Sequence, residues 1–451
     1  MRFLLDIAYS LGLAVASPWL VYRLVRSGGW RDLPARFGAG LGEPIEGSIW
    51  LHGSSAGEVS LLRPLVERLE RERPGVPLVI SAYTATGLAA ARKAFSRHRV
   101  ILFPFDLSFV VRRFMSRLDP RLIVIVESEY WPNFLLEAQR RGVPVAVLNG
   151  KISPRSYRAY RRSVVVPRVL RGLGLIAVQS DEHAERLRRL GVADARIHVT
   201  GNMKYDLAGS GEGAAARREV RRTLRYGDDC LVVIGGSLHP GEHEALIDAF
   251  VGARGSRNAA LILVPRYPAD AESVAARVRA AGFAAVRKTE IDAGRAEPPG
   301  AQGVLVVDTI GELGRLYAAA DVAFVGGSLH FRGTNKGGHN LMEPAILGVP
   351  VLFGPYNFSF KETVEDLLAR DAGILVRDSK ELEHALEALL ADEELRRAIG
   401  ERARQVVLHG QGATARNFAL LTRVLAGTGA SLQAQAFERT MPRAGGHLDS
   451  R

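Results

Sequence analysis

Two acidic segments lie directly behind predicted buried strands, where a parallel α/β sheet presents its ligand-binding edge. Glu58 follows the apolar run Ile49–His52, and Glu127 follows the run Leu122–Val126. A carboxylate in such a position can take a proton from a hydroxyl group. A helix cap also explains Glu58, because Ser55 and Glu58 have the Ser-x-x-Glu spacing of a capping box. The local pattern alone favours the cap slightly, so a catalytic role for Glu58 requires further support.

The second segment carries more chemistry than a helix start requires. Glu127 and Glu129 stand close together, followed by Trp131 and Pro132. Acidic residues are common in the first turn of a helix because the positive end of the helix dipole stabilises their charge. Proline is common there because the backbone N–H that it lacks would have no partner within the helix. That structural explanation accounts for one acid well and for two acids poorly. We therefore expect a functional carboxylate here.

Basic residues follow other predicted strands. Lys151 lies in the hydroxyl-rich segment 149–156, which would suit a phosphate or carboxylate ligand but fits a surface turn equally well. Lys204 lies in Gly201–Asp206, near the end of the first group of strands. Pro265 and Arg266 end another apolar run, which would place the arginine at the ligand-binding edge.

A glycine-rich segment in the second half has the features of a nucleotide site. Phe324–Ser328 contains two glycines, and Gly337–His339 precedes Asn340 and Glu343. Glycines permit close approach of a phosphate, and a carboxylate three residues beyond the asparagine suits a ribose diol. A capping box would explain the Asn–Glu pair but not the glycines. The turn 235–242 resembles a phosphate cradle weakly.

Short apolar runs that alternate with amphipathic stretches must position these residues. The expected strands are Ile49–His52, Pro77–Ser81, Val100–Phe105, Leu122–Val126, Val143–Leu148, Leu173–Val178 and Ile197–Thr200, then Leu231–Gly235, Ala259–Val264, Val304–Val307, Val322–Val325, Pro350–Phe353 and Gly373–Val376. Fully apolar strands between helices indicate parallel sheets covered on both faces. A polar, glycine-containing stretch around 208–222 separates two such groups. This is the outline of the GT-B architecture, two doubly wound Rossmann-like α/β domains with a ligand cleft between them.

Composition narrows the partners. The chain has 451 residues, a formal net charge of +12 and a single cysteine, Cys230. A basic balance fits phosphorylated substrates or an anionic membrane, while basic runs interleaved with aromatics, which would indicate nucleic acid, are missing. One cysteine excludes a disulfide framework. No metal-ligand motif, P-loop or nucleophile elbow occurs in the sequence, so we expect no metal.

The amino terminus is uncharged from Ile7 to Tyr22 and is followed by arginines and tryptophans. It is shorter than the roughly 20 apolar residues of a membrane span. The flanking residues suggest an anchor over 1–30 that holds the protein on the cytoplasmic side of a membrane. A buried first helix of a soluble domain is the alternative. Domains are expected at 31–207 and 208–425, with a disordered tail over 426–451.

In their order along the chain, these segments resemble the 3-deoxy-D-manno-octulosonic acid (Kdo) transferases of Gram-negative lipopolysaccharide synthesis. The strongest matches are Ser55–Glu58, Glu127–Asn133, Phe324–Ser328 and Gly337–Glu343; weaker ones are Phe103–Asp106, Gly201–Asp206, Pro265–Arg266, Gly311–Leu313 and Gly354–Pro355 with Asn357 and Phe360. The resemblance implies a GT-B enzyme of the inner membrane that transfers Kdo from CMP-Kdo to a lipid A precursor, with inversion and without a metal.

The resemblance also assigns roles to residues. It implies that Glu58 is the general base and that Glu127 and Lys204 stabilise the transition state. It implies that CMP is bound by Pro265, Arg266, Ile310, Gly311, Glu312, Asn340, Leu341, Met342 and Glu343. Three departures concern the acceptor and the number of sugars added: extra residues around 333–336, Lys151 in place of an arginine, and Gly236–His239 in place of a Ser-Thr-His sequence. A transferase for another CMP-linked acidic sugar, or a CMP-sugar sensor without activity, remain the alternatives.

Overall fold

The computed structural model describes residue 6 and residues 29–209, 213–333 and 337–440. The chain divides into two compact units. Unit 1 comprises Met1–Asp206 with Gln411–Arg451, and unit 2 comprises Leu207–Gly410. The expected anchor over 1–30 lies almost entirely outside the described residues. Among the residues that are described, no helix is both long and apolar enough to cross a membrane.

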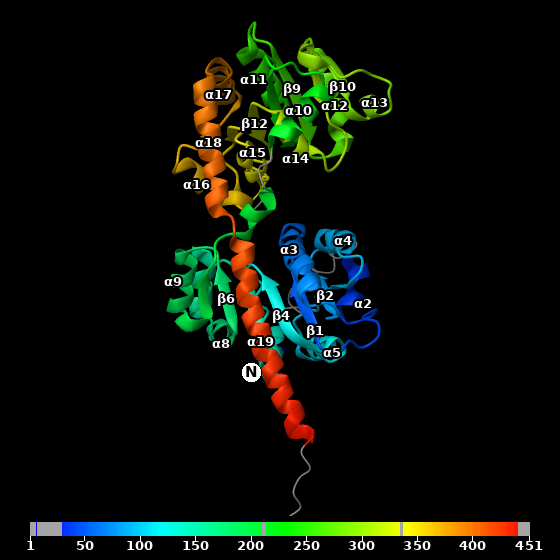
Figure 1. Ribbon diagram of the computed structural model, residues 1–451, viewed down its shortest axis with the longest axis vertical. Coiled ribbons are helices and arrows are strands. Elements are labelled where there is room, and N and C mark those ends of the chain that lie inside the picture. Colours follow the sequence, from blue (N-terminus) through cyan, green and yellow to red (C-terminus); the bar gives the residue numbers. More distant parts are fainter. Residues whose placement is uncertain (1–5, 7–28, 210–212, 334–336, 441–451) are drawn as a thin grey trace, which may run out of the picture. The chain divides into compact units, whose positions relative to one another are not determined.

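Unit 1 is built on a sheet of seven parallel strands, shown in blue to green in Figure 1. The strands are β1 (Ser48–His52), β2 (Leu78–Ala82), β3 (Arg99–Leu102), β4 (Pro120–Val126), β5 (Val145–Gly150), β6 (Leu175–Val178) and β7 (Ile197–Val199). Their order is β3-β2-β1-β4-β5-β6-β7, so the chain reverses direction across the sheet between β1 and β4. All seven strands predicted for this part of the chain are present. Ligands of such sheets bind beyond the carboxyl ends of the strands, at the point where the chain reverses direction.

Helices cover both faces of this sheet. They are α2 (Leu33–Arg36), α3 (Ala56–Glu72), α4 (Ala85–Ala94), α5 (Ser108–Leu118), α6 (Pro132–Arg140), α7 (Pro154–Arg162), α8 (Val165–Arg171) and α9 (Asp181–Arg189). Successive residues of a strand point to opposite faces. Trp50 accordingly belongs to one core cluster with α5 and α6, and its neighbour Leu51 belongs to the other with α3 and α4. This two-sided burial explains the uninterrupted apolar runs.

The carboxyl-terminal helix α19 (Ala413–Thr440), red in Figure 1, belongs to unit 1. Its Phe418 and Leu421 are buried in the α3 side of the core. The Asp206 carboxylate accepts the backbone N–H groups of Gly412 and Thr414, both at 2.6 Å. Two expectations were therefore wrong. The second domain ends near residue 410 rather than 425, and residues 426–440 are helical; residues 441–451 lie outside the described part.

Unit 2 repeats the architecture with a second sheet of seven parallel strands. They are β8 (Leu231–Leu238), β9 (Ala259–Pro265), β10 (Ala284–Arg287), β11 (Gly303–Val306), β12 (Val322–Val325), β13 (Val351–Phe353) and β14 (Ile374–Leu375), in the order β10-β11-β9-β8-β12-β13-β14. Strand β10 was not predicted. It is a short edge strand of sequence Ala-Ala-Val-Arg, and alanine has a low strand propensity, so its signal is weaker than that of the other runs.

The helices of unit 2 surround this sheet. They are α10 (Gly213–Thr223), α11 (Glu242–Arg254), α12 (Ala271–Ala280), α13 (Lys288–Asp292), α14 (Leu313–Leu316), α15 (Met342–Ile346), α16 (Lys361–Leu368), α17 (Ser379–Ala391) and α18 (Glu393–Gly410). Helices α11, α12 and α17 share one apolar core with β8, β9 and β12. The GT-B fold class expected from the sequence is therefore present as two parallel-sheet domains.

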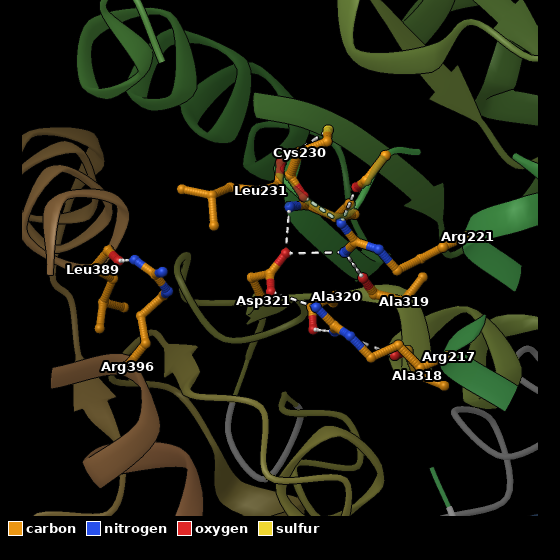
Figure 2. A network of polar contacts seen from close by, with 12 residues as sticks. Arg217, Arg221, Cys230, Leu231, Ala318, Ala319, Ala320, Asp321, Leu389 and Arg396 are labelled. Carbon is orange, nitrogen blue, oxygen red and sulfur yellow. Dashed lines mark hydrogen bonds and ion pairs between the residues drawn. The ribbon is translucent and has the colours of Figure 1, made fainter. Parts of the chain in front are cut away.

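Helix α10 is fastened to the sheet of unit 2 by a network of arginines around Asp321 (Figure 2). The Asp321 carboxylate accepts from Arg217 at 2.7 Å, from Arg221 at 3.3 Å and from the backbone N–H of Val232 at 2.7 Å. Arg221 is buried and also donates to the backbone carbonyl of Ala319. A buried charge of this kind is tolerated because each polar group has a partner. The network therefore holds α10 in a fixed place on unit 2.

Candidate active site

Glu58 lies in the first turn of α3, behind the first strand of unit 1. Its Oε2 accepts the backbone N–H of Ser54 at 2.7 Å, and its Oε1 accepts the Ser55 hydroxyl at 3.1 Å. Ser55 is the N-cap of α3 and is also oriented toward the backbone N–H of Glu58, with an O–N distance of 3.5 Å. The cap predicted as an alternative is therefore present, and it does not compete with a chemical role. It fixes the carboxylate at the edge of the sheet.

The environment of Glu58 favours the protonated carboxyl group. Burial, with the negative charges of Glu127 and Glu129, raises the pKa of Glu58 to about 7, against the opposing bond from Ser54. A carboxyl group with a pKa near the working pH is suited to exchange a proton with a substrate hydroxyl. The side chain is half-buried, so such a hydroxyl can reach it.

Glu127, immediately after β4, has the opposite character. Burial would raise the pKa of this carboxyl group, but Lys204 and Lys151 together hold the pKa below its usual range. The ion pairs measure 2.8 Å from Lys151 Nζ to Glu127 Oε2 and 3.4 Å from Lys204 Nζ to Glu127 Oε1. The site thus keeps one carboxylate ionised beside one that can be protonated, which is the arrangement that separates acid–base roles.

Backbone geometry brings the three segments of this site together. Glu127 and Asn149, each at the end of a strand, adopt positive φ values of 66° and 54°. Such conformations are uncommon outside glycine and occur at sites where a side chain must be redirected. The Asn149 side chain accepts the backbone N–H of Met203 at 2.8 Å, which places the segment containing Lys204 next to β5.

Glu129 completes the cluster. Burial raises the pKa of Glu129, and the neighbouring polar side chains of Ser54 and Trp131 oppose that shift. Trp131 stacks on Tyr83, with ring centroids 5.1 Å apart. The site therefore has an aromatic wall beside its carboxylates. The second acid, which a helix start explained poorly, has a place in the site.

Unit 2 contains a cavity of about 340 Å³ at the carboxyl ends of its strands. It is lined by Ser237, Gly311, Leu313, Gly314, Tyr317, His339, Asn340 and Glu343. Glu343 is half-buried, and burial raises its pKa, while a hydrogen bond from Asn340 opposes the shift. Gly236 allows the cavity to form, since a Cβ atom there would lie 1.9 Å from the Tyr317 hydroxyl oxygen.

Asn340 and Glu343 are joined side chain to side chain. Asn340 Nδ2 donates to Glu343 Oε1 at 3.0 Å, and Asn340 Oδ1 accepts the backbone N–H of Met342 at 3.1 Å. A capping box would instead use the backbone N–H groups of both residues. Helix α15 begins at Met342, so Asn340 precedes it rather than heading it. The second oxygen of Glu343 is left for a ligand in the cavity.

The glycines at 337 and 338 serve packing. Gly337 has a φ of 131°, and a Cβ atom there would lie 2.3 Å from the carbonyl oxygen of Tyr356. A Cβ atom on Gly338 would lie 2.7 Å from the Asn357 side chain. These glycines let the segment before Asn340 pass against the loop after β13. The additional residues expected around 333–336 fall mostly outside the described part of the chain.

The glycines at 326 and 327 do not form an open phosphate cradle. The buried Glu242 carboxylate accepts the backbone N–H groups of Gly327 at 2.6 Å, Ser328 at 2.8 Å and Leu329 at 2.9 Å. It also accepts the backbone N–H of His239 at 2.9 Å. The donors that a phosphate would use are therefore occupied by a side chain of the protein. The expectation of close phosphate approach at this loop was wrong for that reason.

The remaining predicted nucleotide-binding residues have mixed positions. Gly311, Asn340 and Glu343 line the cavity, whereas Pro265, Arg266, Ile310, Glu312, Leu341 and Met342 are not among its lining residues. Leu341 and Met342 are buried in the core, and Glu312 pairs with Lys288 at 3.3 Å. Ile310 is 84% exposed. Among the described residues, no group of three or more histidine, cysteine or acidic side chains could hold a metal ion.

Several site residues were not selected from the sequence. The sequence indicated Lys151 as part of a basic turn and as a replacement for an arginine, but not as a partner of Glu127, and it gave no indication of Tyr317. Tyr317 carries no motif and lies more than 20 residues before Asn340 in the chain, so only the folded sheet brings the two together. For Lys151, the available signal was its position directly after β5, the strand that pairs with β4, which Glu127 follows.

Comparisons with known proteins agree with this geometry. The family described as 3-deoxy-D-manno-octulosonic-acid transferase (kdotransferase) matches residues 31–207, and the family glycosyl transferases group 1 matches residues 301–406. A 3-deoxy-D-manno-octulosonic acid transferase of Bordetella pertussis is 35% identical over 90% of this chain and 96% of its own length. One from Haemophilus influenzae is 30% identical over 91% of this chain and 93% of its own length.

Among solved structures, the fold is shared with the UDP-GlcNAc 2-epimerase of Neisseria meningitidis, with a TM-score of 0.55 and 10% identity over 84% of this chain and all of that one. Acinetobacter baumannii MurG matches with a TM-score of 0.53 and 13% identity over the same shares. At this identity the likeness concerns the fold alone. The sequence relatives, their nearly full coverage and the two parallel-sheet domains lead to one conclusion: the chain belongs to the Kdo transferase family of glycosyltransferases.

Proposed function

We propose that this protein transfers Kdo from CMP-Kdo to a hydroxyl group of a lipid A precursor, with inversion and without a metal ion. The observation that carries the proposal is the pair of carboxylates in unit 1. Glu58 has its pKa raised to about 7 by burial, while Glu127 is held ionised by two lysines. In a member of the Kdo transferase family, this pair provides a base for the acceptor and a charged group that orients two cations.

In the proposed reaction, Glu58 takes the proton from the acceptor hydroxyl as the hydroxyl oxygen attacks the anomeric carbon of Kdo. The bond from that carbon to the phosphate oxygen breaks, and CMP leaves with the bonding electron pair. A single displacement of this kind inverts the anomeric configuration. General-base assistance typically contributes about 10²–10⁴-fold to the rate.

Lys204 and Lys151 supply positive charge at the same edge of unit 1. Their pairing with Glu127 fixes the two ammonium groups. In the proposal, they offset the charge of the Kdo carboxylate and the charge that develops on the departing phosphate. A cation that is already positioned stabilises such charge without reorganisation during the reaction. We infer that this pair of lysines takes the part that a metal ion has in other transferases.

Unit 2 binds the CMP portion of the donor in this proposal. The cavity of about 340 Å³ offers Glu343 and Asn340, a carboxylate and an amide that suit the hydroxyl groups of a ribose. Arg266 follows β9 and contributes positive charge for the phosphate. Membrane association through residues 1–30, on the cytoplasmic side of the inner membrane, completes the proposal. It rests on the apolar stretch with its flanking arginines and aromatics.

A product assay tests the proposal directly. The full chain is incubated with CMP-Kdo and a tetraacylated lipid A precursor, and the lipid product is analysed by mass spectrometry. We expect a mass increase of one or more Kdo residues. A parallel reaction with another CMP-linked acidic sugar is the control for donor identity. Transfer of that sugar in place of Kdo would refute the assignment of the donor, and a product with retained configuration would refute the single displacement.

A further inference from the structure

Two histidines from distant parts of unit 2 meet at the wall of the nucleotide cavity. His239 follows β8, and His339 precedes Asn340 and lines the cavity. Their rings lie parallel, with an interplanar angle of 10° and centroids 5.2 Å apart. The two Nε2 atoms are 3.0 Å apart, which is hydrogen-bond distance. One proton must therefore lie between the rings.

The positions of the other protons follow from the same bond. The Nδ1 atom of His239 is buried without a partner among the described residues. A buried N–H without an acceptor is rarer and more costly than an unused lone pair, so we assign a bare Nδ1 to His239. His239 then donates its Nε2–H to His339. Since a neutral imidazole carries one proton, His339 keeps its own proton on Nδ1, the nitrogen left for a ligand in the cavity.

Charged groups on several elements act on this pair. Arg266 after β9 and Arg332 in the loop before Gly337 are positive, while Glu242 of α11 and Asp270 are negative. Tyr267 packs its ring edge-on against His239, and His330 lies beside Gly241. Burial, with His239 and Arg266, lowers the pKa of His339 to about 4, against the opposing charge of Glu242. Without a ligand the pair is therefore neutral at pH 7.

An anion in the cavity would change the electrostatic field at the pair. The negative charge of a phosphate offsets Arg266 and Arg332, and it favours an additional proton on the two rings. A protonated pair keeps the shared Nε2 proton and carries protons on both Nδ1 atoms. The bound anion and the negative charges of Glu242 and Asp270 then offset the cost of a buried N–H on His239. His339 then donates a charge-assisted hydrogen bond to the ligand, which is stronger than a neutral one.

We propose that His239 and His339 form a proton-sharing anion sensor, in which His339 donates its Nδ1–H to the nucleotide phosphate and the pair takes up one proton as the phosphate binds. This inference rests on the proposed nucleotide site in unit 2. It gives a specific role to two histidines that lie inside segments recognised in the sequence but had no role assigned there. It also makes donor binding dependent on pH.

Calorimetry of CMP binding to the full chain tests the sensor. Binding is measured at pH 6.5 in two buffers with different ionisation enthalpies, for the wild-type protein, for His239→Asn and His339→Asn, and for the control His384→Gln on the exposed face of α17. Because CMP itself titrates near this pH, the quantity compared is the difference in proton uptake between wild type and variant. We expect net proton uptake in the wild type and the control. Both histidine variants should lose that uptake and bind CMP about tenfold more weakly.

Cytidine, which lacks the phosphate, separates the possible outcomes. We expect wild type and His339→Asn to bind cytidine equally. Equal CMP affinity and equal proton uptake in wild type and variants would overturn the sensor while leaving the nucleotide site intact. If wild type bound neither CMP nor cytidine, the proposed donor site itself would be wrong.

A second measurement does not depend on the folding of the variants. In wild-type protein labelled with ¹⁵N-histidine, imidazole nitrogen shifts report the protonation state directly. We expect CMP at pH 7 to move two imidazoles toward the imidazolium form. Spectra that show no histidine changing protonation state would contradict the proposal.

Discussion

Glu58 in unit 1 and Glu242 in unit 2 occupy the same topological position. Each lies in the first turn of the helix that follows the first strand of its sheet, in α3 after β1 and in α11 after β8. Glu58 is half-buried and accepts one backbone N–H and one hydroxyl group. Glu242 is 1% exposed and accepts four backbone N–H groups. The same residue at the same place thus has a raised pKa and an open side in one unit, and is enclosed by backbone N–H groups in the other.

The number of donors around the carboxylate decides the difference. Four backbone N–H groups satisfy Glu242 fully and leave no room for a substrate. Glu58 has two local donors and two acidic neighbours, Glu127 and Glu129, so its charged form is poorly stabilised. A poorly stabilised carboxylate accepts a proton readily, which is what a general base requires.

The largest expected effect is on transfer by Glu58→Gln. We expect kcat to fall by about 10²–10⁴-fold, because the amide cannot take the acceptor proton. CMP affinity, measured by calorimetry, should stay unchanged. Glu67→Gln is the matched control, since Glu67 lies on the same helix in an exposed pair with Arg63. Near-normal turnover in Glu58→Gln would reduce Glu58 to a helix cap.

Glu242→Ala should instead lower stability. Four N–H groups would lose their acceptor, which we expect to reduce the free energy of unfolding by about 3–5 kcal/mol, measured by denaturant titration. Glu244→Ala is the control. Glu244 lies two residues further along α11, its side chain is 44% exposed, and it accepts the backbone N–H of Gly241. Its loss should therefore cost about 0.5–1 kcal/mol. Equal losses of stability in the two variants would show that Glu242 has no special structural role.

Glu343→Gln should weaken CMP binding by about 10- to 150-fold, because a hydrogen bond to a charged group contributes about 1.5–3 kcal/mol. Titration calorimetry gives the dissociation constant, and the exposed Glu387→Gln on α17 is the control. An unchanged constant would exclude Glu343 from the nucleotide site and leave its bond to Asn340 as a purely structural contact.

The pH profile sharpens the contrast between the two glutamates. Glu58 acts as a base only when deprotonated, and its pKa is raised to about 7, so kcat/KM should fall about tenfold per pH unit below pH 7 and level off above it. Glu127→Gln removes a charge that raises the pKa of Glu58, and therefore the inflection should move to lower pH. An inflection that stays in place would show that burial alone sets this pKa.

Much of this architecture was predictable because buried parallel strands leave a strong local signal. All strands of unit 1 were expected, and the Ser55–Glu58 and Asn340–Glu343 pairs were recognised by spacing. The edge strand β10 was missed because its short, alanine-rich sequence is a weak strand signal. Helix α19 was assigned to the wrong unit, because its return to β5 and β6 depends on contacts far away in the sequence.

The sequence by itself determined the parallel-sheet domains, the boundary near residue 207 and the identity of Glu58, Glu127 and Glu343 as candidates. These features follow from residue type and local spacing. Only the tertiary structure decided which carboxylate has a raised pKa and which is fully hydrogen-bonded. That choice depends on how many backbone N–H groups, lysines and acids surround each oxygen. Lys151 meets Glu127 across 24 residues and His239 meets His339 across 100, distances at which local pattern carries no information.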